Sequence, residues 1–277
     1  MEPKVSANYP FGCVALALTG ITAMTGHAET SRTAPPDMLL RPALRSFEVT
    51  TGTQQLTGPY SSWHHLTVHG VLEQDNHVLQ AELSNKNEYR TNGTFLGLTD
   101  TVTLDDSRFA SLSVGVGDGA FYLPRYRLDG FFYKKWLPEK NFISSLGVGY
   151  YDAPDGHVDL SISLGGAWYF ELPLVLEGGV RFNRSNPGGV MTHQQFVATN
   201  YNPDPRNTLS ARVAWGSEGY LPLALGTSLV NFNSQEASLA WRYRINQNWG
   251  ASISINHYRN PTYERSGVDI GLSRHFD

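Results

Sequence analysis

Apolar and polar side chains alternate with a period of two along most of the chain after residue 45. Between Glu236 and Ile245 one side carries Ala237, Leu239, Trp241, Tyr243 and Ile245, and the other carries Glu236, Ser238, Ala240, Arg242 and Arg244. Successive side chains of a β-strand point to opposite faces, so this pattern predicts strands. No helical period longer than two turns interrupts it, and we expect an all-β fold.

The alternating stretches number about fourteen, although twelve strands also fit the pattern. They cover residues 46–54, 62–73, 77–89, 93–104, 109–117, 125–136, 142–151, 157–170, 175–184, 193–201, 208–216, 235–245, 249–258 and 264–276. The longest exceeds the five or six residues of a typical strand and suits the roughly 9 to 11 that cross a bilayer at a tilt. We predict a single closed antiparallel transmembrane β-barrel over residues 46–277. A soluble sandwich of two sheets is the alternative.

The amino-terminal residues have the features of a secretory signal peptide. Lys4 precedes an apolar run over residues 11–24, and Gly26-His27-Ala28 supplies the small residues of a cleavage site. A run of about 14 apolar residues is too short for the roughly 20 of a membrane-spanning helix. We predict a signal peptide over residues 1–28 that is removed after Ala28. Residues 29–45 are rich in proline and should form an irregular periplasmic lead-in.

Composition excludes several classes of protein. The formal net charge is −4 and the basic residues are scattered, so no basic surface is available to bind nucleic acid. The single cysteine, Cys13, should leave with the signal peptide, so neither disulfides nor thiol chemistry are expected. The mean hydropathy of −0.30 agrees with strands that place one face against lipid and the other against a polar lumen.

The connections between the predicted strands offer a test of orientation. Bacterial barrels have short turns in the periplasm and longer loops outside the cell. If both termini are periplasmic, every second connection should be tight. The pattern mostly follows this expectation, because the longer connections are residues 55–61, 118–124, 185–192 and 217–234.

The last predicted strand resembles the carboxyl-terminal strand of outer-membrane proteins. Asp269, Gly271 and Phe276 fit its pattern of polar, glycine and aromatic positions, whereas Arg274 and Asp277 depart from it. We predict that this strand is the membrane-insertion signal recognised by the barrel-assembly machinery.

The chain from about Ser46 to Phe276 resembles the YaiO family of outer-membrane β-barrel proteins. The resemblance rests on strands punctuated by arginine and acidic residues, at residues 126–130, 177–182 and 239–243, and on the ending at residues 271–276. It implies an outer-membrane location and a barrel fold, and it brings no established reaction.

The alternation predicts which charged side chains face the lumen. They are Glu48, Glu73, Glu82, Arg127, Asp129, Asp159, Glu177, Arg181, Arg212, Glu236, Arg242, Arg244 and Asp269. A barrel of about fourteen strands is too wide for side chains alone to fill, so these charges can line water or link opposite walls. One interpretation is an ion-pair network that stiffens and partly plugs the lumen. The other is a selective lining for an anionic or saccharide solute.

Aromatic side chains are expected at the two membrane interfaces, where amphipathic rings are favoured. The candidates near strand ends or on the outward face are Trp63, Tyr150, Trp168, Phe170, Trp215, Trp241 and Trp249.

No catalytic or metal site is predicted. His65 and His69 share a strand face but lie about 13 Å apart at roughly 3.3 Å per residue, too far for one ion, and His64 points the other way. No Gly-x-Ser-x-Gly motif is present. We expect no enzyme and no cofactor.

Three functions remain open at this stage. The first, which we predict, is an outer-membrane channel or structural envelope component linked to saccharide passage, with outer-membrane lipids as surroundings. The second is a lipid- or polysaccharide-modifying enzyme acting at the barrel rim. The third is a soluble periplasmic sandwich that binds carbohydrate.

Overall fold

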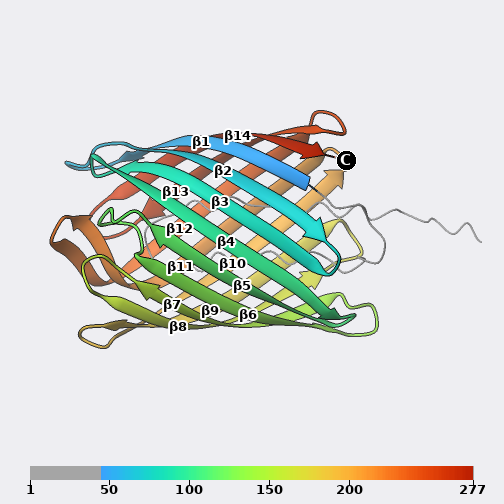
Figure 1. The fold of residues 1–277 in the computed structure, drawn as a ribbon, viewed down its shortest axis with the longest axis horizontal. Helices are drawn as coiled ribbons and strands as arrows, with labels where there is room; N and C mark the ends of the chain where they lie inside the picture. The colour runs from blue at the N-terminus through green and yellow to red at the C-terminus, as the bar shows by residue number, and fades with distance from the viewer. Residues whose placement is uncertain (1–44, 277) are drawn as a thin grey trace, which may run out of the picture.

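The period-two stretches form fourteen antiparallel strands that close into one barrel (Figure 1). The computed structural model describes residues 45–276. The strands are β1 (Arg45–Leu56), β2 (Trp63–Gln74), β3 (His77–Glu88), β4 (Thr91–Asp105), β5 (Arg108–Gly117), β6 (Tyr126–Trp136), β7 (Phe142–Asp152), β8 (Val158–Tyr169), β9 (Leu174–Asn186), β10 (Val190–Asp204), β11 (Asn207–Ala224), β12 (Thr227–Arg244), β13 (Trp249–Arg259) and β14 (Glu264–Phe276). The predicted signal peptide and all but the last residue of the predicted lead-in lie outside the described residues.

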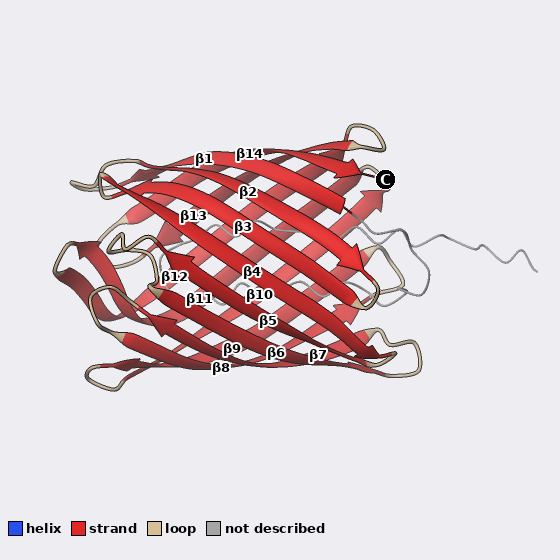
Figure 2. Cartoon of the chain, in the orientation of Figure 1, coloured by secondary structure: helices blue, strands red, loops and turns tan. Residues whose placement is uncertain are grey.

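Strands and turns account for the whole of this part of the chain (Figure 2). Within residues 45–276, no helix has the length and apolar character needed to cross a membrane.

Closure is achieved by pairing the first strand with the last. β1 pairs with β14 from Arg45↔Phe276 to Leu56↔Arg265, and every other strand pairs with its neighbours in the sequence. A closed barrel leaves no row of unpaired backbone groups in the hydrocarbon, where each would cost several kcal/mol. The prediction of a single closed barrel is confirmed, fourteen strands replace the alternative of twelve, and a two-sheet sandwich is excluded.

The outer wall of the barrel is apolar. In β12, Leu239 and Trp241 are 51% and 46% exposed, while Ala240 between them is 7% exposed. In β14, Val268, Ile270 and Leu272 are exposed and Asp269 is buried. Large apolar side chains on the outside with polar ones inside are the reverse of a soluble protein and fit a wall that faces lipid.

An Ile270→Arg substitution tests this outer wall. Ile270 lies midway along β14 on the outward face, so a cation there should lower the free energy of unfolding by about 2–4 kcal/mol, the cost of a basic side chain near the bilayer midplane. Urea titration, followed by the folded band on a semi-native gel, measures the change. Ile270→Leu is the control and should be neutral, and equal stability of the two variants would contradict a lipid-facing position.

Most of the predicted interfacial aromatics lie on the outer wall, but Trp63 does not. Trp168, Trp215 and Trp241 point outward and are 40–46% exposed. Trp63 opens β2 on the inward face and is 2% exposed, so its assignment to a membrane interface was wrong. At a strand end the face on which a residue lies depends on the exact register, and a shift of one residue moves the side chain to the other face.

The predicted long loop over residues 217–234 is also wrong. β11 and β12 each run for 18 residues and turn at Leu225-Gly226, so this segment is a hairpin that projects beyond its neighbours (Figure 1). The connection predicted at 185–192 is likewise short, covering residues 187–189. Outside the membrane a strand needs no apolar outer face, so the period-two signal fades while the strand continues.

The two ends of the barrel therefore differ less in turn length than predicted. Arg45 and Phe276 lie at the same end, which the sequence analysis assigns to the periplasm. Turns at this periplasmic end have two to five residues, and those at the opposite, extracellular end have two to eight. The clearest asymmetry is the overhang of β11 and β12.

Glycines on the inner face make room for aromatic rings that lie against the wall. A methyl group on Gly147 would stand 2.3 Å from the Phe131 ring. Phe131 is 6% exposed and packs with Phe109, Tyr133 and Ile143 in an inner cluster near the periplasmic end.

A Gly147→Ala substitution should destabilise the barrel by about 1–3 kcal/mol, the usual cost of overpacking, because the Phe131 ring must move. The midpoint of urea unfolding measures this. Gly130→Ala is the matched control in β6, since its new methyl would meet nothing nearer than 3.9 Å. If both variants unfold at the same urea concentration, the packing account is wrong.

Candidate functional site: the lumen of the barrel

The register of the fourteen strands places every predicted lining charge on the inner face. These are Glu48, Glu73, Glu82, Arg127, Asp129, Asp159, Glu177, Arg181, Arg212, Glu236, Arg242, Arg244 and Asp269. Several of them meet in separate groups, and the groups sit at different heights along the barrel.

The first group lies near the periplasmic end. Arg242 Nη2 is 3.1 Å from Glu48 Oε2, and Ser252 Oγ donates to Glu48 Oε1 at 2.9 Å. Glu48 is on β1 and Arg242 on β12, two strands that are not neighbours, so the pair crosses the inner surface of β13 and β14. Arg206 and Arg244 line the same small cavity of about 70 Å³, which makes this mouth of the barrel basic.

The second group is centred on Asp269 of β14. Ser254 Oγ donates to Asp269 Oδ2 at 2.9 Å, Asn256 Nδ2 donates to the same oxygen at 3.4 Å, and His65 Nε2 lies 3.6 Å from Oδ1. The carboxylate thus links β2, β13 and β14 on the inside of the closing seam. Of the other residues proposed as an insertion signal, Gly271 lies on the same inner face and Phe276 stacks outside on Phe47 at 5.7 Å. Recognition by the assembly machinery stays a prediction.

The third group occupies the opposite wall. Arg127 Nε donates to Asp129 Oδ2 at 2.6 Å within β6. Arg181 of β9 approaches Asp129 across Gly149 of β7. A methyl group built on Gly149 would stand within 4 Å of both Asp129 Oδ1 and Arg181 Nη2, so the two side chains lie over the same glycine. Arg181 also lines a small cavity with Asp159 of β8. Cations and carboxylates alternate here, so neither sign dominates the wall.

The remaining lining charges are distributed between these groups. The Arg212 guanidinium lies 4.3 Å from the centre of the Phe196 ring, a cation–π contact on the inner face. Glu177 accepts a long hydrogen bond of 3.5 Å from Asn200. Glu82 lies on the inner face of β3 and Glu236 on that of β12.

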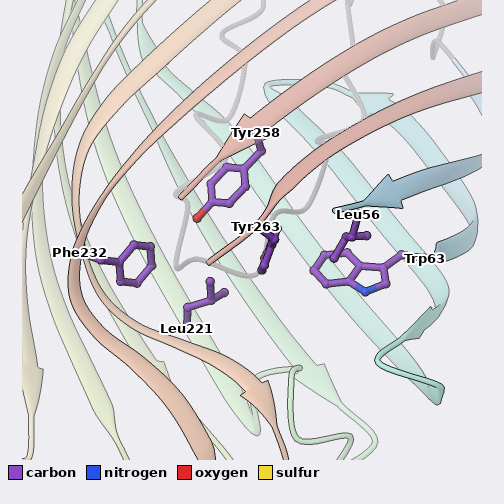
Figure 3. Packing of buried hydrophobic residues seen from close by; sticks show 6 residues of the cluster. All are labelled: Leu56, Trp63, Leu221, Phe232, Tyr258 and Tyr263. Carbon is purple, nitrogen blue, oxygen red and sulfur yellow. The ribbon is translucent and has the colours of Figure 1, made fainter. Parts of the chain in front are cut away.

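Sequence reasoning missed an aromatic cluster at the extracellular end of the lumen (Figure 3). We call it the mouth cluster, and its buried members are Leu56, Trp63, Leu221, Phe232, Tyr258 and Tyr263. Leu221 belongs to β11 and Trp63 to β2, which are separated along the wall by β12, β13, β14 and β1. The mouth cluster therefore crosses part of the lumen and narrows it on this side.

A buried arginine sits beneath the mouth cluster. Arg265 is 1% exposed and lies between Trp63 and Tyr258, with 5.0 and 4.8 Å from its guanidinium carbon to the two ring centres. Its guanidinium nitrogens have no hydrogen-bond partner among residues 45–276. Burial raises the pKa of the Tyr263 phenol in the adjoining turn to about 12, so this ring stays neutral at physiological pH.

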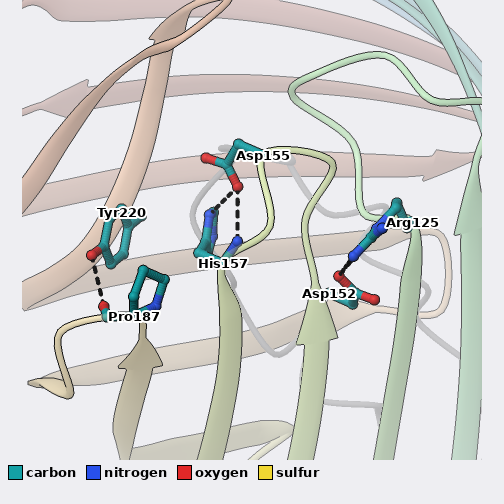
Figure 4. A network of polar contacts seen from close by, with 6 residues as sticks. All are labelled: Arg125, Asp152, Asp155, His157, Pro187 and Tyr220. Atoms are coloured by element: carbon teal, nitrogen blue, oxygen red, sulfur yellow. Dashed lines mark hydrogen bonds and ion pairs between the residues drawn. The ribbon is translucent and has the colours of Figure 1, made fainter.

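Loops extend the closure around the rest of the mouth (Figure 4). His157, held by Asp155 in the turn after β7, stacks on Tyr220 of β11 with ring centres 4.8 Å apart. Tyr220 Oη donates to the carbonyl of Pro187 at 2.9 Å. Tyr122, in the connection before β6, donates to the carbonyls of Lys86 and Thr91. Tyr220 thus fixes β11 of the extended hairpin to the two loops that hold His157 and Pro187.

The histidines singled out in the sequence do not gather. His65 and His69 face the lumen, His65 meets Asp269, and His64 points outward. Over residues 45–276, no three His, Cys, Asp or Glu side chains are placed to hold a metal ion.

A closed antiparallel barrel with an apolar outer wall and a charged inner wall is an outer-membrane β-barrel. The YaiO membrane beta barrel domain matches residues 44–221, and the chain belongs to the YaiO family. The protein is accordingly a resident of the outer membrane. A comparison with curated proteins gives no match.

Solved structures show the same fold at low sequence identity. The COG4313 outer membrane channel from Pseudomonas putida F1 is 8% identical with a TM-score of 0.52, over 88% of this chain and 100% of that chain. A bacterial polysaccharide outer membrane secretin is 11% identical with a TM-score of 0.52, over 84% and 98%. A loop L8 deletion mutant of OmpT, an outer membrane protein of Vibrio cholerae, is 9% identical with a TM-score of 0.50, over 85% and 99%.

Proposed function

We propose that this protein is an outer-membrane channel for polar, uncharged solutes, and that saccharides are the class it admits. The observation that carries the proposal is the pairing of opposite charges on the inner wall. Glu48 with Arg242 and Asp129 with Arg127 each join a carboxylate to a guanidinium. A wall of mutually compensated charges produces little net field, so it favours neutral polar solutes over ions of one sign.

The groups between the charges suit saccharides. Hydroxyl and amide side chains that are half-buried also lie on the inner face, including Thr99, Ser113, Ser163, Gln194, Ser238, Ser252 and Ser254. Like the hydroxyls of a sugar, side-chain hydroxyls both donate and accept hydrogen bonds. A saccharide can therefore replace the water bound to the wall at a small cost in free energy. The fold shared with a polysaccharide outer membrane secretin supports this choice of solute class.

Single-channel recording in planar bilayers tests the proposal. The refolded barrel should give stepwise conductance, and a neutral oligosaccharide such as maltohexaose should reduce the current in a concentration-dependent way. If protein that migrates as a folded barrel gives no conductance steps, the proposal of a channel is wrong. If maltohexaose leaves the conductance unchanged, the proposal of saccharides as the solute class is wrong.

An Arg212→Glu substitution should shift the ion preference of the channel toward cations. Arg212 faces the lumen from β11, so the change removes one positive charge and adds one negative charge at the wall. The reversal potential under a salt gradient measures the shift. Arg184→Glu is the matched control, because Arg184 is exposed on the outer face of β9, and a shift of the same size in both variants would place Arg212 outside the conduction path.

The second candidate is a structural envelope component with a sealed lumen. The mouth cluster favours it, since six buried side chains cross one side of the extracellular end. The conductance experiment separates the two candidates: a barrel that inserts and stays silent is structural. Export through a signal peptide cleaved after Ala28 belongs to either proposal, and sequencing the amino terminus of the protein from outer membranes tests it.

A further inference from the structure

A cavity of about 820 Å³ opens on the outside of the barrel at its extracellular end. It exists because β12 runs past β13. The pairing of these strands stops at Gln235↔Arg259, while β12 continues toward Thr227 and is paired there with β11 alone. The turn between β13 and β14, residues 260–263, forms the facing wall. We call this space the rim notch.

The floor of the rim notch is a row of four outward side chains. Trp215, Gln235, Arg259 and Glu264 are successive register partners across β11, β12, β13 and β14, so they lie side by side on one line. Trp215 is 43% exposed. Arg259 Nε lies 3.3 Å from Glu264 Oε1. The row combines an open aromatic face, an amide and an ion pair.

The wall formed by the β13–β14 turn is held in place by its own hydrogen bonds. Asn260 Oδ1 accepts from the backbone N–H groups of Thr262 and Tyr263 at 2.7 and 2.9 Å. Tyr263 is anchored in the mouth cluster and is 3% exposed. The Glu264 N–H donates to Thr57 Oγ1 at 2.9 Å. A notch whose walls are already ordered spends little conformational entropy on binding.

The chemistry of the notch identifies the class of ligand. Its volume lies within the about 300–1,000 Å³ of small-molecule sites. An exposed indole accepts the C–H face of a sugar ring, and planar amide, guanidinium and carboxylate groups accept and donate to neighbouring hydroxyls. An acyl chain would displace water from the polar floor without replacing its hydrogen bonds, and an anion would meet the carboxylate of Glu264 beside Arg259.

We propose that the rim notch binds a saccharide at the outer surface of the barrel, with Trp215 as the stacking platform and Gln235, Arg259 and Glu264 as hydrogen-bonding groups. The site is independent of conduction through the lumen, because its floor faces outward. Two sources present this chemistry at such a place: a free oligosaccharide outside the cell, and the saccharide headgroup of a glycolipid in the outer leaflet.

Isothermal titration of the full barrel in phosphatidylcholine nanodiscs tests the proposal, with delipidated lipopolysaccharide core oligosaccharide and maltohexaose as probes. A second arm measures retention of intact lipopolysaccharide by the barrel during nanodisc assembly. We expect at least one arm to show binding, and Trp215→Ala to weaken it at least tenfold. Binding of free oligosaccharide identifies a soluble ligand, and binding in the lipopolysaccharide arm alone identifies a glycolipid headgroup.

Controls keep the result specific. Trp241→Ala removes an equally exposed outward tryptophan from the periplasmic end of β12 and should leave binding unchanged. Trp215→Phe keeps an aromatic face and should stay within about threefold of the native affinity. If Trp215→Ala fails to fold, Gln235→Ala replaces it, with an expected loss of at least threefold. Absence of binding in both arms, or equal losses in Trp215→Ala and Trp241→Ala, would overturn the proposal.

Discussion

Shortening the β11–β12 hairpin should raise the single-channel conductance several-fold. Glu218 and Phe232 are register partners, so replacing residues 219–231 by Asn-Gly joins them through a two-residue turn that suits a hairpin. The deletion removes Leu221 from the mouth cluster and Tyr220 from its contacts with His157 and Pro187. The extracellular mouth should then be wider, because the side chains of Leu221 and Tyr220 no longer cross it.

A shorter deletion provides the control. Replacing residues 223–227 by the same turn between Pro222 and Ser228, which are also register partners, keeps both Tyr220 and Leu221. Its conductance should stay close to the native value. If neither deletion changes the conductance, the narrowest part of the lumen lies below the mouth cluster.

Reversing the charge of Arg242 should lower the free energy of unfolding of the barrel strongly. In Arg242→Glu, a second carboxylate faces Glu48, which is buried and already uses one oxygen to accept from Ser252. Breaking a buried ion pair costs about 3–5 kcal/mol, and partial solvation of Arg242 places the expected loss near the lower figure, about 3 kcal/mol. The urea midpoint of the folded band on a semi-native gel measures it.

The double variant Glu48→Arg with Arg242→Glu separates the pair from the individual residues. Exchanging the two charges rebuilds an attractive pair across the inner surface of β13 and β14, so most of the lost stability should return. A double variant as unstable as the single one would show that Arg242 stabilises the barrel through other contacts.

The membrane-spanning strands could be predicted from the sequence because lipid on one face favours apolar side chains and water on the other favours polar ones. In β12, Ala237 to Arg244 alternate as the sequence predicts, and the structure keeps that facing. The same rule fails for the overhang of β11 and β12, where the outer face no longer has to be apolar and the inner face packs Leu221 and Phe232 into the mouth cluster. Glu218, Tyr220 and Asn233 carry no alternation that would separate a strand from a loop.

Arg274 shows how a departure from a motif can be explained by position. It breaks the expected pattern of the last strand, yet its guanidinium lies 5.2 Å from the Trp249 ring centre and 5.0 Å from that of Phe276. Its place is the outer face of β14 at the periplasmic end, where a cation can reach lipid headgroups while its stem covers apolar surface.

The mouth cluster could not be derived from the sequence, because it depends on how the barrel closes. Trp63 and Leu221 are 158 positions apart, and only the order of strands around the wall brings their sides of the lumen together. Arg265 was overlooked for a related reason. Its inward facing was predictable from Asp269 four residues later, but its place between Trp63 and Tyr258 requires the seam between β1 and β14.

Single-cysteine labelling along β12 tests most directly whether adjacent side chains face lipid and water in turn. The sequence has one cysteine, in the predicted signal peptide, so cysteines placed singly at residues 237–242 report without background. In vesicles, a small water-soluble maleimide should label cysteines at positions 238, 240 and 242 through the lumen. A fluorophore attached to a cysteine at position 237, 239 or 241 should instead be quenched by a quencher dissolved in the lipid. Equal labelling of even and odd positions by the maleimide, or no labelling at either, would contradict a lipid-facing outer wall around a polar lumen.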